Sequence, residues 1–202
     1  MIVVGVTGNL ASGKSEVAKF FKAWGALVFD ADTAAKKAVE KGRPAYRALV
    51  KLFGEAFLLP TGEVHRKKLA EHVFRHPKDL KKLNTLIHPG VIFESLKEIE
   101  KNQKKKGILV LDAPLLFESK MQGLVDFTVV VSSAERELIK RAVKKDLNTE
   151  LAKKILSTQW PLRRKEKMAD FVIENNGTLK DLEKKSRHIW DQIKKGEGND
   201  GY

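Results

Sequence analysis

The amino-acid sequence predicts an α/β protein with a parallel sheet that helices cover on both faces. Short runs of apolar, often β-branched residues recur along the 202 residues, and helical patterns lie between most of them. Strands that are buried on both faces carry such continuous apolar runs. The length fits one domain, at roughly 100–200 residues per domain, and it is enough to bury one hydrophobic core.

The runs predict five strands, at residues 2–6, 27–29, 108–111, 127–131 and 171–173. Helices are predicted at residues 15–24, 134–144, 149–159 and 179–195. Alternation of strands and helices is typical of a sheet with parallel strands.

The long gap between the second and third strands predicts an inserted helical subdomain. Its pattern is helical from Thr33 to Glu100, with punctuation at residues 42–44 and 60–62 and at Pro77 and Pro89. The gap is too long for a simple crossover. We therefore expect a core (residues 1–33, 93–133 and 168–195), a helical insertion (34–92), a further helical segment (134–167) and a polar, glycine-rich tail (196–202) that frays.

Composition and charge exclude several classes of function. The chain has no cysteine, which excludes a disulfide scaffold, a cysteine-ligated metal and a thiol nucleophile. No apolar run reaches the roughly 18 residues of a membrane span, and the first residues lack a secretory signal, so a cytoplasmic protein is expected. The net charge of +13 indicates an anionic partner or a surface solvated by lysine.

A phosphate-binding loop follows the first predicted strand. Residues 8–15 read GNLASGKS, which matches G-x-x-x-x-G-K-[ST], and a predicted helix follows. Backbone N–H groups in such a loop, together with the positive end of the helix dipole, bind phosphates. Lys14 can reach the β- and γ-phosphates, and the Ser15 hydroxyl can bind Mg²⁺. The expected ATP contacts are Gly8, Asn9, Ala11, Ser12, Gly13, Lys14, Ser15 and Glu16.

Three aspartates follow predicted strands, where ligands lie in open α/β sheets. Asp30 and Asp32 come after the second strand and could bind Mg²⁺, take a proton from a substrate hydroxyl, or cap the helix that follows. One aspartate could serve each role. Asp112 ends the third strand, where an acid helps to hold Mg²⁺, or it serves in the turn before Pro114.

Basic residues gather in the second half of the chain. Arg136, Lys140, Arg141, Lys144 and Lys145 fall at helical spacing, and a second group lies at residues 163–167. They form either a mobile basic hairpin over the phosphates or a solvated helix face. Residues 65–68 likewise either bind an anion or belong to the solvated surface. His88 precedes Pro89, and a lone histidine is more often structural than catalytic.

An ordered set of motifs resembles the dephospho-coenzyme A kinase family, P-loop kinases related to nucleoside monophosphate kinases. The set consists of VTGNLASGKS (residues 6–15), FDAD (29–32), GEVHRKKLAEHVF (62–74), LNTLIHPGV (83–91), DAPLLFE (112–118) and ADFVIENNG (169–177). The resemblance implies a three-layer P-loop NTPase fold with a five-stranded parallel sheet, a helical substrate-binding insertion and a helical lid, residues 134–167.

The resemblance also implies an activity, namely transfer of the γ-phosphoryl group of ATP to the 3′-hydroxyl of dephospho-CoA, with Mg²⁺ as cofactor. Asp32 matches the general base and Lys14 the phosphate-binding lysine. The remaining expectations are substrate contacts at Arg66, His88, Pro114 and Leu115, ATP contacts at Lys140, Arg141, Lys144, Asn175 and Asn176, and Mg²⁺ ligands at Ser15 and Asp112. ATP and dephospho-CoA are the expected partners of a monomer or weak homo-oligomer that binds neither nucleic acid nor membrane.

The chain departs from the family pattern in two places. Asn9 and Ala11 replace glycines of the family loop, so a stiffer loop is expected. Lys140 and Lys144 stand where the family favours arginine, and Arg141 could serve with a shift of one residue. A nucleoside or nucleoside monophosphate kinase is the alternative function. A nucleic-acid-binding P-loop protein is a further one, although 7% aromatic residues speak against it.

Overall fold

The computed structural model describes residues 1–196. Of the predicted tail only Gly196 is described, where its left-handed backbone ends the last helix, and the other predicted tail residues lie outside the described part. Each predicted strand is present, extended by one or two residues at its carboxyl end. The bounds are β1 (Ile2–Gly8), β2 (Leu27–Asp30), β3 (Ile108–Asp112), β4 (Phe127–Ser132) and β5 (Phe171–Glu174).

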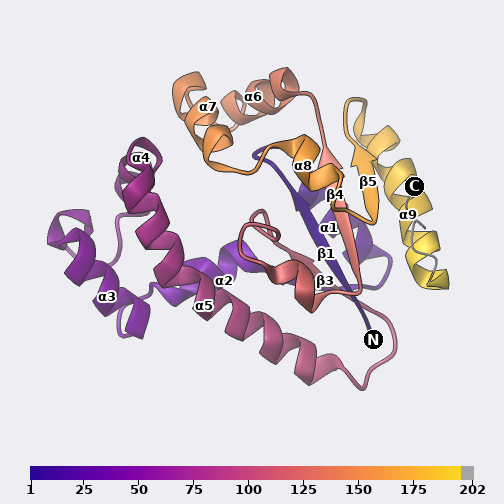
Figure 1. Cartoon of the computed structure of the whole chain (residues 1–202), viewed down its shortest axis with the longest axis horizontal. Helices are drawn as coiled ribbons and strands as arrows, with labels where there is room; N and C mark the ends of the chain where they lie inside the picture. The colour runs from indigo at the N-terminus through magenta and orange to yellow at the C-terminus, as the bar shows by residue number, and fades with distance from the viewer. Residues whose placement is uncertain (197–202) are drawn as a thin grey trace.

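The strands form one parallel sheet in the order β2-β3-β1-β4-β5. The register pairs Val6 with Asp112 and Asp30 with Asp112. Because all strands are parallel, their carboxyl ends meet at one edge of the sheet, where β1 runs into the glycine-rich loop (Figure 1).

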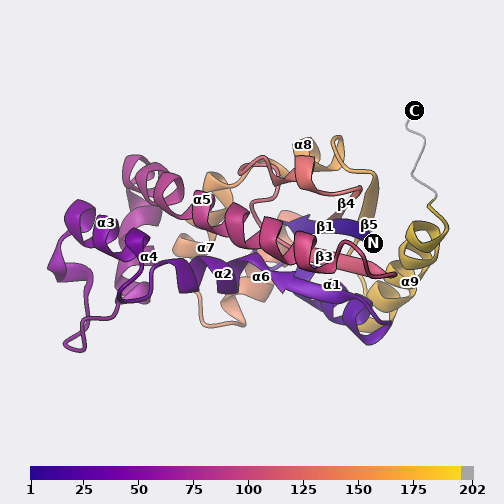
Figure 2. The same cartoon turned by 90° about the horizontal axis from the view of Figure 1, so that it is seen from below.

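Helices cover both faces of the sheet, as predicted. One face packs on α1 (Lys14–Ala23) and α9 (Leu179–Lys195), through Phe21 and Trp190 among others. The opposite face, with Leu109 and Leu111, packs on α2 (Ala31–Ala38) and α5 (Pro77–Asn102). Figure 2 shows α1 and α8 on opposite sides of β1. The result is the three-layer α/β arrangement that the sequence predicts.

The insertion is a cluster of helices with a core of its own. It contains α2, α3 (Pro44–Phe53), the short helix η1 (Glu55–Phe57), α4 (Arg66–Arg75) and the first half of α5. Leu49, Leu69 and Val73 are buried together inside it. The expectation that Pro89 interrupts the helix is wrong, because α5 continues through it. Proline removes one backbone bond, and buried neighbours on α5, such as Leu83 and Val91, hold the helix together on either side. Insertion and core therefore share one continuous helix, and the expected boundary at residue 92 falls inside it.

The segment between β4 and β5 forms α6 (Glu135–Val143), α7 (Thr149–Thr158) and α8 (Leu162–Glu166). Figure 1 shows these helices above the carboxyl ends of the strands, and α7 contacts α4 of the insertion. The basic residues 163–167 form part of the short helix α8 and the residue after it.

Local sequence signals explain where the helices begin and end. Thr178 and Asp181 form a reciprocal capping box at the start of α9. Asn148 caps α7 by accepting a hydrogen bond from Leu151 N. None of the described helices is both long and apolar enough to cross a membrane.

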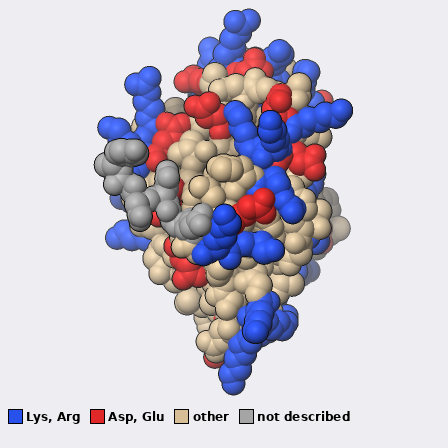
Figure 3. All heavy atoms as spheres, turned by 90° about the vertical axis from the view of Figure 1, so that its right-hand side faces the viewer, with Lys and Arg blue, Asp and Glu red and all other residues tan. Residues whose placement is uncertain are grey.

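The positive charge is spread over the surface. On the face drawn in Figure 3, lysines and arginines form several groups that carboxylates and other residues separate. On that face the excess of basic residues serves as a solvated surface rather than as one continuous patch.

Candidate active site

The phosphate loop has a backbone shape that requires glycine at two positions. A Cβ on Gly8 would lie 2.6 Å from the Val131 carbonyl oxygen and would also collide with the Ser12 hydroxyl. Gly13 has φ 100°, and a Cβ there would collide with the Asn175 side chain. Gly13 also precedes α1 without any side-chain cap, and the Glu16 and Val17 N–H groups donate to its carbonyl, so the N–H groups of the first turn ahead of Glu16 remain available to a ligand.

Ala11 departs from the glycine pattern and adopts a left-handed backbone with φ 57°. An alanine pays a steric cost in this conformation, of order 1 kcal/mol, that a glycine avoids. Side chains from distant segments brace the loop on both sides of Ala11. Asn175 donates from Nδ2 to the Ser12 carbonyl at 2.7 Å, and the Leu10 N–H donates to Gln159 Oε1 at 2.9 Å. The loop is thus held in place from outside.

Lys14 lies between two carboxylates at the carboxyl edge of the sheet. Its Nζ is 2.9 Å from Asp112 Oδ1 and 3.5 Å from Asp32 Oδ2, and its side chain is 12% exposed. Burial works to lower the pKa of Lys14, but the charges of Asp112 and Asp32 outweigh burial and raise the pKa. Burial raises the pKa of Asp112, an effect that Lys14 opposes. The cluster therefore keeps a protonated lysine where the motif places phosphate.

The structure separates the roles of the two aspartates after β2. Asp30 caps α2, accepting hydrogen bonds from Thr33 N at 3.0 Å and Thr33 Oγ1 at 2.8 Å. Burial works to raise the pKa of Asp30, but these bonds outweigh it and lower the pKa. Asp32 lies in the first turn of α2 with its side chain 53% exposed, and in the described part of the chain it makes no hydrogen bond. Its carboxylate is therefore free to accept a proton from a substrate.

The oxygen donors beside Lys14 suit Mg²⁺. Ser15 is exposed in the first turn of α1, and Asp112 ends β3 next to the loop. One hydroxyl and one carboxylate are the kind of ligand set that Mg²⁺ takes when phosphates and water complete its coordination.

Comparison with known proteins agrees with this geometry. The sequence model of the dephospho-CoA kinase family matches residues 2–181. The chain belongs to the dephospho-CoA kinase family. It is 40% identical to a dephospho-CoA kinase from Bacillus licheniformis over 199 residues, which is 96% of this chain and 99% of that one.

Solved structures agree with the family assignment. A protein from Thermus thermophilus superimposes with a TM-score of 0.75 at 33% identity, covering 95% of this chain and 97% of the other. A dephospho-CoA kinase from Campylobacter jejuni gives a TM-score of 0.70 at 26% identity, with 96% and 98% covered. The predicted fold class and kinase activity are thereby confirmed.

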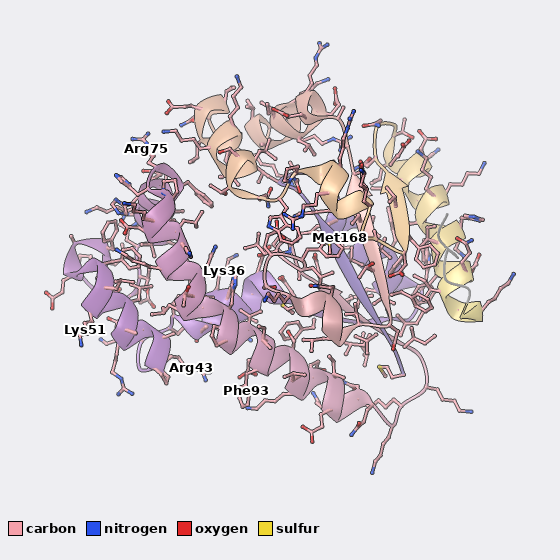
Figure 4. All side chains as sticks on the ribbon, viewed as in Figure 1. Lys36, Arg43, Lys51, Arg75, Phe93 and Met168 are labelled. Atoms are coloured by element: carbon pink, nitrogen blue, oxygen red, sulfur yellow. The ribbon has the colours of Figure 1, made fainter. Side chains whose placement is uncertain are left out.

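Two of the expected acceptor-side residues of this family member, Arg66 and His88, come from the insertion. Arg66 is the first residue of α4, and its Nη2 donates to the Lys36 carbonyl on α2 at 3.1 Å. Figure 4 labels Lys36 at the inner side of the insertion, toward the core. His88 lies on α5, and its Nε2 is buried without a hydrogen-bond partner among the described residues. Burial lowers the pKa of His88, although the charge of Glu118 opposes this.

Pro114 and Leu115 follow β3. The Pro114 carbonyl accepts hydrogen bonds from Thr7 Oγ1 at 3.2 Å and from Lys165 Nζ at 3.1 Å, and Leu115 is half-buried. The Pro114 carbonyl is therefore already engaged within the protein.

Of the three expected lid cations, the structure brings one to the loop. Arg141 donates from Nη2 to the Asn175 carbonyl at 2.9 Å, and the same Asn175 braces Ser12. Lys140 is 61% exposed and lies 3.9 Å from Glu137, and Lys144 is exposed at the end of α6. The side chain of Asn176 accepts a hydrogen bond from Ala134 N at 3.0 Å, which holds the start of the lid. Arg141 therefore lies beside the residue that braces the loop, Lys140 and Lys144 are exposed, and the ATP contacts expected of all three stay predictions.

Sequence reasoning missed several residues that shape the site. Lys165, grouped with the surface cations, is fully buried and paired with Glu118 at 2.9 Å. Gln159 and Trp160, which bind the phosphate loop, were not singled out. Glu118 lies within the quoted motif DAPLLFE, so one signal was present. The others have no local signature, because their partners lie far away along the chain.

A cavity of about 1170 Å³ lies beside α2. It is lined by Thr33, Ala34 and Lys37 of α2 and by Arg43 and Phe93, among others. Figure 4 labels Arg43 and Phe93 at the outer side of the insertion. Asp30 also lines this cavity, whereas Asp32 does not.

Proposed function

We propose that this protein transfers the γ-phosphoryl group of ATP to the 3′-hydroxyl of dephospho-CoA, giving CoA and ADP. Membership of the dephospho-CoA kinase family supports the choice of substrates. The observation that carries the proposed mechanism is the Asp32 carboxylate, 3.5 Å from the Nζ of the phosphate-loop lysine and free of hydrogen bonds in the described residues. The proposal includes Mg²⁺ as cofactor, a cytoplasmic location, and a monomer or weak homo-oligomer.

Positioning and charge neutralisation supply most of the catalysis in such a reaction. The loop N–H groups and the first turn of α1 bind the phosphates of ATP. Lys14, which its carboxylate neighbours keep protonated, places a positive charge on the transferring group. When bound, Mg²⁺ would neutralise charge between the β- and γ-phosphates, held by Ser15 and Asp112.

Asp32 acts as the general base of the proposed transfer. The acceptor oxygen forms a bond to the γ-phosphorus while the bond to the β-phosphate oxygen breaks, and ADP leaves with that electron pair. The proton of the acceptor hydroxyl passes to the Asp32 carboxylate. Asp30 is less suited to this role, because both of its oxygens accept hydrogen bonds from Thr33, which lower its pKa and make it a weaker base.

Arg66 is the cation proposed for the acceptor. It is exposed at the start of α4 and is linked to α2, the helix that carries Asp32. A guanidinium binds phosphate oxygens through paired donors, and dephospho-CoA carries a diphosphate. Arg66 would therefore place the acceptor relative to Asp32.

The test is a panel of acceptors. Purified protein is incubated with ATP and Mg²⁺ plus dephospho-CoA, adenosine or AMP, and ADP release is followed while mass spectrometry and phosphorus NMR identify the product. Rapid phosphorylation at the 3′-hydroxyl of dephospho-CoA, abolished by a chelator, is the expected result. Preferential phosphorylation of adenosine or AMP would replace the proposal by a nucleoside or nucleoside monophosphate kinase.

A further inference from the structure

A buried ion pair joins the short helix α8 to the segment that follows β3. The Lys165 side chain is fully buried, and its Nζ lies 2.9 Å from Glu118 Oε1 and 3.1 Å from the Pro114 carbonyl. Burial lowers the pKa of Lys165, although the charge of Glu118 opposes this. A buried ion pair is costly to desolvate, and an apolar pair of similar volume is often as stable. Fold stability alone therefore gives no reason for a charged pair at this place.

The same carboxylate oxygen holds the turn between α7 and α8. Glu118 Oε1 also accepts a hydrogen bond from the Trp160 N–H at 2.9 Å. The Trp160 ring is covered by the guanidinium of Arg164, 3.5 Å from the ring centroid. Trp160 is thus fixed from the core side by Glu118 and from the lid side by Arg164.

The turn between α7 and α8 also holds the first half of the phosphate loop. Gln159 Oε1 accepts the Leu10 N–H at 2.9 Å, and the Trp160 carbonyl accepts Asn9 Nδ2 at 3.3 Å. Ala11, the next residue along, has the left-handed backbone with φ 57°. Strained conformations persist where the surroundings over-determine them, and they cluster at functional sites. The braces at Leu10 and at Ser12 supply that constraint on either side of Ala11.

We propose that Glu118, Lys165 and Gln159 are positioning residues for nucleotide binding: the ion pair fixes the turn between α7 and α8, and that turn fixes the shape of the phosphate loop. The inference rests on the proposed function only in taking this loop as the ATP site. It also makes the turn a point at which the lid and the loop are coupled, since α7 and α8 both belong to residues 134–167.

The test uses the full chain and four single variants. Gln159→Met removes the acceptor for Leu10 N from a half-buried side chain, while Glu118→Gln and Lys165→Met each remove one charge of the pair. Lys167→Met is the matched control, because Lys167 is an exposed cation just after α8 whose side chain makes no hydrogen bond or ion pair among the described residues. Each variant is assayed for the Kd of ATP without acceptor, for kcat, for both KM values and for Tm.

The expected result for Gln159→Met is an ATP Kd and ATP KM raised by about tenfold or more, because a small misplacement of a binding group has effects of this size. The KM for dephospho-CoA and the Tm should stay near those of the wild type. Lys165→Met and Glu118→Gln should weaken ATP binding in the same way. Combining Lys165→Met with Gln159→Met should add little, because both changes act through one turn.

Two results would overturn the inference. One is a folded Gln159→Met protein that binds ATP as the wild type does, which decides the matter even if the buried-pair variants fail to fold. The other is a loss of Tm in Lys165→Met or Glu118→Gln with unchanged ATP affinity, the pattern of a purely structural pair. Failure of the wild type to phosphorylate dephospho-CoA would contradict the proposed function and leave the ATP Kd comparison to decide the inference separately.

Discussion

Lys14 has a structural role and a proposed catalytic one, and the two can be separated by experiment. In Lys14→Met the Asp112 carboxylate, whose side chain is 8% exposed, loses its partner at 2.9 Å. Breaking a buried pair by removing one partner costs about 3–5 kcal/mol. The Asp32 side chain is 53% exposed, so water screens its share. We expect the free energy of unfolding to fall by about 3–4 kcal/mol, because both side chains of the Lys14–Asp112 pair are largely buried.

Replacing Asp112 as well removes the uncompensated charge. Lys14→Met with Asp112→Asn should therefore recover most of the lost stability, while turnover stays at least about a hundredfold below the wild type, because the cation on the transferring group is gone. Thermal unfolding followed by circular dichroism gives the first quantity, and ADP release with saturating dephospho-CoA gives the second. Wild-type kcat in Lys14→Met, or recovery of activity together with stability in the double variant, would refute the role assigned to Lys14.

Three further predictions follow from single contacts. Asp30→Ala should lower the free energy of unfolding by about 1 kcal/mol at neutral pH through loss of the helix cap. Because folding lowers the Asp30 pKa below its ordinary 3.8, this stabilisation is present above pH 3.8 and fades as pH falls through the folded-state pKa. A difference in unfolding free energy from the wild type that is undiminished at about pH 2 would contradict this prediction. Arg66→Ala should raise the KM for dephospho-CoA by about tenfold and leave that for ATP nearly unchanged, whereas equal effects in steady-state kinetics would make Arg66 plain surface. Arg141→Met should raise the KM for ATP well above that of Lys140→Met, since Arg141 alone of the two contacts Asn175, and equal KM values would remove this distinction.

The parts of the fold that could be predicted are those with a local signal. The five strands are continuous apolar runs because helices bury both faces of the sheet, and each run appears in the structure as a strand. The phosphate loop was predictable because its glycines meet steric demands that few other residues satisfy, as Gly8 and Gly13 illustrate. Pro89 was misjudged because its cost to α5 is local, whereas the packing that carries the helix past it is not.

The residues of the candidate site could be predicted better than the contacts between them. Asp30 and Asp32 both lie at the start of α2. From the sequence alone, either could have been the residue that caps the helix and either the free carboxylate. The hydrogen bonds of Thr33 identify Asp30 as the cap, because the Thr33 N–H and hydroxyl both donate to it. Lys165 was grouped with surface cations because its partner, Glu118, is distant in sequence and only the folded chain brings them together.

The central claim is that Asp32 is the base that receives the acceptor proton, and Asp32→Asn tests it most directly. Asparagine is nearly isosteric and leaves the Asp30 cap untouched, so fold and ATP affinity should persist. Removing a general base typically costs 10²–10⁴-fold, so kcat should fall by about two orders of magnitude or more. Asp30→Asn is the matched control, since asparagine caps helices about as well as aspartate, and it should keep most of the wild-type kcat. The measurement is kcat for both variants at two Mg²⁺ concentrations with saturating dephospho-CoA. Our account predicts a large loss in Asp32→Asn that Mg²⁺ does not restore, and wild-type kcat in that variant, or its full rescue by Mg²⁺, would contradict it.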